Sequence, residues 1–240
     1  MLKSPTSIYP FTIKSFNADY KGLLSMSSLF LFLQECAWEN AMENGFGYEF
    51  VESENALWVL TRVLVKMDHL PKWKEDISIK TWPRHHDGLL AIRDYQIMKD
   101  DLVLGGVSSS WLILDKISKR PRKLTDFPFS SYDFIQEKAI VSLPQKIMLP
   151  EGLKMLDQRK VYASDMDVNG HVNNATYVRW IFDAYFSGYQ EQFKEFEINF
   201  LGELKLNDEF LIYEGNKNAQ YFYLIKTLEN NIVCTARIGF

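Results

Sequence analysis

Two adjoining stretches decide how this sequence is interpreted: DMDVNGHVNN, residues 165–174, and the amphipathic segment ATYVRWIFDAYFSG, residues 175–188. Asp167, Asn169 and His171 alternate along the first stretch. Alternate residues of an extended segment point to the same side, so this spacing predicts a carboxylate, an amide and an imidazole facing one cavity. Together with free N–H groups at the start of the following helix, these groups favour acyl hydrolysis.

A turn that leads into a helix explains the same residues without any catalysis. Gly170 would supply the flexible backbone, and Asn173 or Asn174 would cap the helix. Asx-rich loops are common before helices, so spacing alone leaves both interpretations open.

A second copy of the turn and helix occurs in the first half of the chain. The stretch NADYKGLLSMSS, residues 17–28, leads into LFLFLQECAWENAMENG, residues 29–45, where apolar residues recur at helical spacing before Gly45. Superposition by eye pairs Asp19 with Asp167, Gly22 with Gly170, and Leu23 with His171. A purely structural turn does not need an imidazole in one copy and a leucine in the other, so the repeat favours a reaction centre in the second half only.

Segments with strand character follow each predicted helix, which indicates an α+β fold rather than a doubly wound parallel sheet. Three turn signals, Asp100-Asp101, Asn207-Asp208 and Asn230-Asn231, predict hairpins between antiparallel neighbours. The predicted strands are residues 56–67, 77–84, 90–100 and 108–115 in the first half, and residues 196–203, 209–215, 221–229 and 232–240 in the second.

The proline-rich region from Arg120 to Leu153 separates the two halves. We predict an N-terminal half at residues 1–135, a linker at 136–155 and a C-terminal half at 156–240. A connection of this length crosses the surface or wraps a sheet, and has room for a short helix.

The composition describes a globular protein, with 240 residues, 47% hydrophobic side chains and a net charge of -4. It argues against a nucleic-acid partner. Cys36 and Cys234 match no metal-ligand spacing, and we expect both to be buried. No apolar run is long enough to span a membrane, and the N-terminus does not resemble a signal peptide. We therefore expect a cytoplasmic protein without a membrane partner.

The other histidines give little support to a metal site. His85 and His86 are adjacent, so an extended strand points them to opposite sides. We interpret them, with Asp87, as a turn beside Gly88, and we expect His69 at the surface. We predict no metal and no cofactor.

Several stretches together resemble the acyl-acyl-carrier-protein (acyl-ACP) thioesterases of plants and bacteria. DMDVNGHVNNATYVRWI is similar to that family's C-terminal signature, and residues 58–84, 93–97 and 108–124 are similar to its N-terminal half in order and spacing. The resemblance implies a tandem (double) hotdog, in which two long helices are each wrapped by an antiparallel sheet and the two sheets join into one. It also implies hydrolysis of fatty acyl-ACP to free fatty acid and the carrier thiol.

The resemblance assigns the catalytic residues as well. Asp167, Asn169 and His171 match catalytic positions of the family, and Glu203 takes the role of its catalytic glutamate, with Glu197 as the alternative. Plant members have a cysteine after that glutamate, where this chain has leucine. We therefore expect activated water, rather than a thiolate, to attack the thioester.

The resemblance also implies an acyl pocket, which we place in the first half, and a degenerate site there. Asn174, Trp58 and Leu33 are the predicted substrate-binding residues, although core packing explains the last two equally well. The length of the pocket would set the preferred chain length, because each buried methylene contributes about 0.8 kcal/mol.

Carrier proteins are acidic, so docking requires a local basic surface. The densest cluster holds Lys119, Arg120, Arg122 and Lys123, with Lys116 nearby. A solvated loop explains the same charges without a partner. Other functions remain open: an acyl-CoA thioesterase, a 3-hydroxyacyl-thioester dehydratase or a non-catalytic acyl-binding protein, any of them as a homodimer.

Overall fold

The computed structural model describes residues 5–127, 134–189 and 193–240. The chain forms two compact units, one of Met1–Ser25 with Leu31–Pro144 and one of Met26–Phe30 with Gln145–Phe240. The chain thus leaves the first unit after Pro144, within the segment predicted as linker. The three-part division of the chain stays a prediction.

The first unit is an antiparallel sheet with the strand order β1-β3-β4-β5-β2, and the short β6 pairs with β5. Helix α1, Met26–Glu43, packs on this sheet: Phe32 stacks on Phe11 of β1 with 4.3 Å between ring centroids. Asn40 of α1 accepts a hydrogen bond of 2.7 Å from Arg93 of β4. The bounds are β1 Ser7–Thr12, β2 Ala56–Met67, β3 Asp76–His86, β4 Ala91–Lys99, β5 Leu102–Asp115, β6 Pro121–Arg122 and α2 Tyr48–Ser53.

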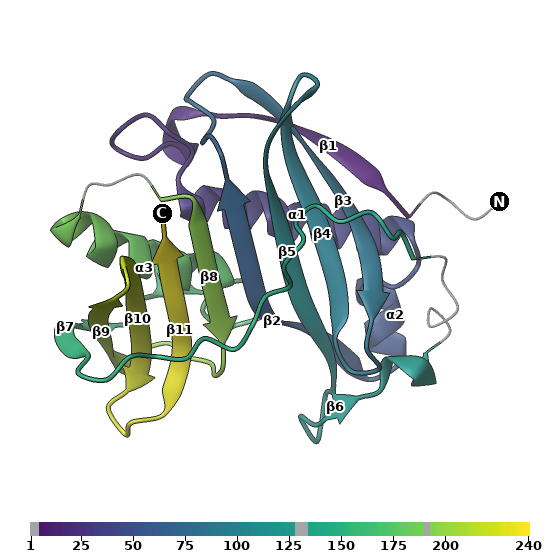
Figure 1. Ribbon diagram of the computed structural model, residues 1–240. Coiled ribbons are helices and arrows are strands. Elements are labelled where there is room, and N and C mark those ends of the chain that lie inside the picture. Colours follow the sequence, from purple (N-terminus) through teal and green to yellow (C-terminus); the bar gives the residue numbers. More distant parts are fainter. Residues whose placement is uncertain (1–4, 128–133, 190–192) are drawn as a thin grey trace. The chain divides into compact units, whose positions relative to one another are not determined.

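The second unit is an antiparallel sheet with the strand order β8-β11-β10-β9-β7. Helix α3, Asn174–Gly188, lies behind these strands in Figure 1. Its aromatic side chains fill the space against the sheet, with Trp180 4.3 Å from Phe210 and Phe182 5.0 Å from Phe196 between ring centroids. The bounds are β7 Lys154–Lys160, β8 Glu195–Phe200, β9 Glu209–Lys217, β10 Gln220–Thr227 and β11 Ile232–Gly239.

The predicted helices are confirmed, and Asn173 is the cap of α3. Its side-chain oxygen accepts a hydrogen bond of 2.8 Å from the N–H of Ala175. Two of the three predicted hairpins are also confirmed, because Asp100 and Asn230 adopt positive φ angles of 51° and 70° between paired strands.

The third predicted hairpin, at Asn207-Asp208, is wrong. The strands that flank it do not pair, since β8 pairs with β11 and β9 pairs with β10 and β7. The N–H of Asn207 instead donates to Val161, and the N–H of Val161 donates to Asp208. The tight turn of this region is at Asn218 and Ala219, which connect β9 to β10.

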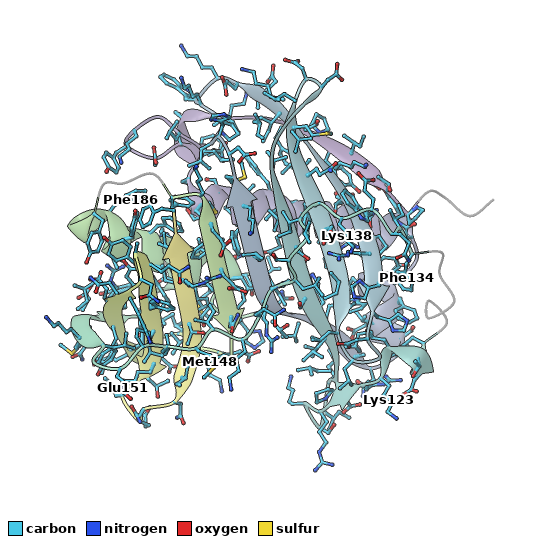
Figure 2. All side chains as sticks on the ribbon, in the orientation of Figure 1. Lys123, Phe134, Lys138, Met148, Glu151 and Phe186 are labelled. Atoms are coloured by element: carbon cyan, nitrogen blue, oxygen red, sulfur yellow. The ribbon has the colours of Figure 1, made fainter. Side chains whose placement is uncertain are left out.

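The segment after residue 133, which includes the start of the predicted linker, runs along the face of the first sheet opposite α1 (Figure 1). Figure 2 shows Lys138 on this segment, in front of the strands. The Trp82 indole N–H donates to the Glu137 carbonyl at 3.1 Å. The buried carboxylate of Asp94 accepts the N–H of Ala139 at 3.0 Å and pairs with Arg84 at 3.4 Å.

The same segment continues along the outer face of the second sheet, where Figure 2 labels Met148. The N–H of Gln145 donates to Glu197 at 2.5 Å, and Asn199 bonds the backbone of Gln145 and Ile147 at 2.9 Å each. Glu197 and Asn199 alternate with residues that face α3, so they point to the opposite side of the sheet. Two buried polar side chains therefore bind the linker backbone.

Candidate functional site

The backbone from Asp167 to His171 is a tight turn, so the predicted extended geometry is wrong. The N–H of Asp167 donates to the His171 carbonyl at 2.7 Å, and the N–H of Gly170 donates to the Asp167 carbonyl at 3.1 Å. Gly170 has a positive φ of 77°, which glycine adopts without steric cost. The turn that leads into a helix is therefore confirmed as a structural element.

The carboxylate of Asp167 holds this turn from the inside. Its Oδ1 accepts the backbone N–H of Asn169 at 2.8 Å and the backbone N–H of His171 at 3.3 Å. The Asn169 side-chain amide lies 3.5 Å from Oδ2, a weak contact, and the rest of this exposed residue faces solvent. Within the described residues, no hydrogen bond joins the Asp167 carboxylate to the imidazole of His171.

The imidazole of His171 lies instead beside Glu203. Its Nε2 is 3.5 Å from Oε2 of Glu203, and the two side chains are 43% and 61% exposed. Both groups are thus accessible to water and to a substrate. A histidine beside a carboxylate is an arrangement suited to proton transfer near neutral pH.

The segment that carries Glu203 is anchored on α3 by the next residue. Leu204 is fully buried, and its N–H donates to the hydroxyl of Tyr177 at 3.1 Å. Burial raises the pKa of Tyr177, so the phenol stays protonated while it accepts this bond. In the sequence, Tyr177 is one residue of the amphipathic segment 175–188 without a sign of this role, although a buried tyrosine hydroxyl usually has a hydrogen-bond partner.

Glu197, the alternative catalytic glutamate, is unsuited to that role. It is 3% exposed, accepts the Gln145 N–H and pairs with Arg237 at 2.8 Å. Its carboxylate is therefore fully engaged on the linker side of the sheet.

The start of α3 provides a donor for a developing negative charge. The Asn173 side chain and carbonyl accept the N–H groups of Ala175 and Thr176. Within the described part of the chain, the N–H of Asn174 has no hydrogen-bond partner. An unpaired N–H at a helix N-terminus, together with the helix dipole, stabilises an anion.

The two apolar residues assigned to the acyl pocket are packed in the first unit. Leu33 is buried, and Trp58 donates its indole N–H to the Phe46 carbonyl at 3.0 Å while it packs on a hydrophobic cluster. A hollow of about 690 Å³ opens in the second unit, and neither Trp58, Leu33 nor His171 lines it. Its lining residues are Gln158, Arg159, Lys160, Tyr162, Ser164, Asp165, Arg179, Trp180, Asp183 and Glu209.

The residues of the predicted basic cluster fall into two groups, those that bind neighbouring acidic residues and those that are exposed without an ion pair among the described residues. Arg122 donates to the carbonyl of Glu54, pairs with its carboxylate at 3.3 Å and lies over the Phe127 ring. Lys116 pairs with Glu52. The remaining basic residues, Lys119, Arg120 and Lys123, are exposed and have no ion pair among the described residues. Figure 2 shows Lys123 near β6.

The remaining sequence predictions concern residues outside the candidate site. The turn at Gly88 is present, but it begins at Asp87, because His85 and His86 are the last residues of β3. Asp87 accepts the N–H groups of Leu89 and Leu90, and His86 accepts that of Gly88. His69 is exposed, and both cysteines are buried and free, as expected. None of the helices in the described ranges contains an apolar stretch that could span a membrane.

Comparisons with known proteins show which family and which fold the chain resembles. Residues 8–132 match the family model described as the acyl-ACP thioesterase N-terminal domain, and residues 152–239 match the acyl-ACP thioesterase C-terminal domain. The chloroplastic oleoyl-acyl carrier protein thioesterase 1 of Arabidopsis thaliana is 23% identical over 194 residues, which cover 72% of this chain and 53% of that protein. The chain thus spans about half the length of the curated relatives it matches.

Two solved structures are similar over nearly the whole chain. An acyl-ACP thioesterase from Bacteroides thetaiotaomicron is 25% identical, with a TM-score of 0.91 and 98% of each chain covered. The 12:0-ACP thioesterase from Umbellularia californica is 18% identical, with a TM-score of 0.85, and the match covers 100% of this chain and 98% of that one. The α+β tandem hotdog fold is confirmed by these similarities.

Proposed function

The chain belongs to the acyl-ACP thioesterase family, and from this premise we propose that it hydrolyses fatty acyl-ACP to free fatty acid and the carrier thiol. The observation that carries the proposal is the 3.5 Å approach of His171 to Glu203 beside the start of α3. His171 and Glu203 can transfer a proton, and the start of α3 offers an N–H donor for an oxyanion. Thioester hydrolysis by water requires both of these functions.

In the proposed reaction, water attacks the thioester carbonyl while His171 takes one of its protons. Glu203 orients the imidazole and stabilises its charged form. The resulting oxyanion is stabilised by the N–H of Asn174 and the dipole of α3. The intermediate then collapses, the carbon–sulfur bond breaks, and the imidazolium returns the proton to the departing thiolate.

Other residues of the proposed site bind the substrate. The side chain of Asn169 is exposed next to His171 and orients the thioester. Trp58 and Leu33 remain the proposed contacts of the acyl chain, and their apolar surroundings support that assignment. Water is the proposed nucleophile because fully buried Leu204 follows Glu203, and neither cysteine is near the pair in sequence.

We propose that the acyl carrier protein docks on Lys119, Arg120 and Lys123. Their exposure and lack of ion pairs among the described residues leave their charge available to an acidic partner. We retain a cytoplasmic location, which two buried free thiols support, and a homodimer as the predicted assembly.

The test is a direct assay of the purified chain with saturated acyl-ACP substrates of increasing length. Free fatty acid and free carrier thiol should appear in equal amounts, and one chain length should be preferred. The same acyl groups on coenzyme A provide the comparison. Faster hydrolysis of the CoA esters would identify the chain as an acyl-CoA thioesterase. Loss of water from a 3-hydroxyacyl thioester without release of thiol would identify it as a dehydratase.

A further inference from the structure

The first unit contains a second copy of the turn that carries His171. The Oδ1 of Asp19 accepts the N–H of Lys21 at 2.8 Å and the N–H of Leu23 at 3.0 Å. The N–H of Asp19 donates to the Leu23 carbonyl at 2.7 Å, and the N–H of Gly22 donates to the Asp19 carbonyl at 3.0 Å. These are the four hydrogen bonds of the Asp167 turn, residue for residue.

The backbone conformation of the two turns agrees as well. Gly22 has a φ of 76° and Gly170 a φ of 77°. Isolated bridges close the two turns at equivalent places, Ala18 with Leu24 and Met166 with Val172. A three-residue 3-10 helix precedes each turn, at Ser15–Asn17 and at Ala163–Asp165.

The chemistry of the two turns differs, although their carboxylates make the same bonds. Leu23 stands where the second turn has His171, and Lys21 stands where it has Asn169. An aliphatic side chain cannot transfer a proton, so the carboxylate of Asp19 has a structural task. That task is to bind two backbone N–H groups and fix the direction of the residue after the glycine.

We propose that Asp167 is a positioning residue, whose carboxylate binds the backbone N–H groups of Asn169 and His171 and so holds His171 toward Glu203, as Asp19 holds Leu23 in the non-catalytic copy. This inference rests on the proposed hydrolase function. It changes the role that the family resemblance implies for Asp167, and it confines proton transfer to His171 and Glu203.

The hydrogen bonds at Asp167 support this role. Oδ1 is occupied by two backbone donors, and the only contact described for Oδ2 is the Asn169 amide at 3.5 Å. The imidazole of His171 turns to Glu203 instead. An asparagine oxygen accepts backbone N–H groups at such turns as aspartate does, so the carboxylate charge is not required for the turn.

Two substitutions separate positioning from proton transfer. Asp167→Asn keeps the acceptor and should retain turnover within about threefold, with an unshifted pH profile, whereas Asp167→Ala loses the acceptor and should lower kcat by at least about tenfold with little change in KM. A general base at this position would instead make Asp167→Asn lose at least about a hundredfold. That loss, or a displaced limb of the pH profile, would overturn the proposal.

Matched substitutions at Asp19 supply the control. Asp19→Ala should lower the melting temperature about as much as Asp167→Ala, because the same two bonds are lost. It should leave kcat unchanged below the transition. A parallel loss of kcat in Asp19→Ala would contradict a local role for the turn.

A structural readout keeps this inference separate from the proposed function. The imidazole NMR signals of His171 should match wild type in Asp167→Asn and should broaden or shift in Asp167→Ala. If wild type releases no fatty acid, the hydrolase proposal fails while the NMR comparison still decides the positioning role. Identical His171 signals in all three proteins would refute that role.

Discussion

The hydroxyl of Tyr177 accepts a 3.1 Å hydrogen bond from the backbone N–H of Leu204, and so links the core-facing side of α3 to the segment that carries Glu203. Leu204 is fully buried, whereas Glu203 is largely exposed. Anchoring Leu204 therefore directs Glu203 outward, where His171 lies.

Replacing Tyr177 with phenylalanine should test this link. The substitution leaves the buried Leu204 N–H without an acceptor, which should lower the free energy of unfolding by about 1–3 kcal/mol. We also expect a lower kcat, because Glu203 is held less firmly. Urea unfolding and steady-state kinetics provide the two measurements.

The matched control is Tyr189→Phe at the other end of α3. It removes a 3.0 Å bond to Glu214, away from the candidate site. This variant should lose stability without losing turnover. If both tyrosine variants lower kcat equally, the anchoring role of Tyr177 is wrong.

Two glutamates of the second unit should respond in opposite ways to the same substitution. Glu203→Gln removes the negative charge beside His171 and should lower kcat by at least about a hundredfold. Glu197→Gln keeps an acceptor for the Gln145 N–H on the linker side of the sheet, so kcat should stay near wild type. Steady-state kinetics on one acyl-ACP substrate compares them.

Substitution of His171 completes this comparison. His171→Ala should match the loss in Glu203→Gln, and the double variant should lose little more, because the two side chains act as a unit. His69→Ala, at an exposed histidine, is the control. Wild-type turnover in His171→Ala would remove the proposed mechanism.

The turns and helices could be predicted from sequence because their determinants are local. Asp167 accepts a backbone N–H two residues ahead and Gly170 adopts the positive φ of the turn. Asn173 caps the next helix by accepting the N–H of a residue two positions away. The alternation of Asp167, Asn169 and His171 predicts extended backbone, but these residues form a turn, because the Asp167 carboxylate binds its own backbone instead of facing a cavity.

Contacts between distant residues could not be read from the sequence. Arg122 binds Glu54, which lies 68 positions away in the sequence. The basic cluster therefore gives no sign that one of its side chains already has an ion-pair partner. Asn207 resembles a hairpin signal but bonds Val161 instead of closing paired strands. Only the family resemblance predicts that Glu203 and His171 belong to one site, because the two residues lie on separate segments of the chain.

The two cysteines should remain unreactive in the native protein. Burial raises the pKa of the Cys36 thiol from 9.0 to about 12 and raises that of Cys234 as well. Thiolate is the reactive form, so alkylating reagents should modify neither residue until the chain unfolds, and activity should persist. Modification of a single native cysteine with loss of activity would argue for a thiol route.

The same shift of the Cys36 pKa makes stability depend on pH. The buried thiol of the folded protein has a raised pKa, so above pH 9.0 the unfolded chain loses the Cys36 proton more readily than the folded one does. The stabilisation that the neutral thiol contributes is therefore fully present below pH 9.0 and is lost as pH rises toward about 12. Wild type should therefore lose more stability than Cys36→Ala between about pH 8 and pH 10.5. Urea unfolding of both proteins at the two pH values measures the difference, and parallel losses would contradict it.

Charge reversal should distinguish docking residues from structural ones within the basic cluster. Arg120→Glu combined with Lys123→Glu should raise KM for acyl-ACP and reduce its salt dependence, with kcat unchanged, because the reversed charges repel the acidic carrier. Arg122→Glu should instead lower thermal stability, since it breaks the bonds to Glu54 and places like charges together. If the salt dependence of KM for acyl-ACP is unchanged in the double variant, the carrier docks elsewhere on the protein.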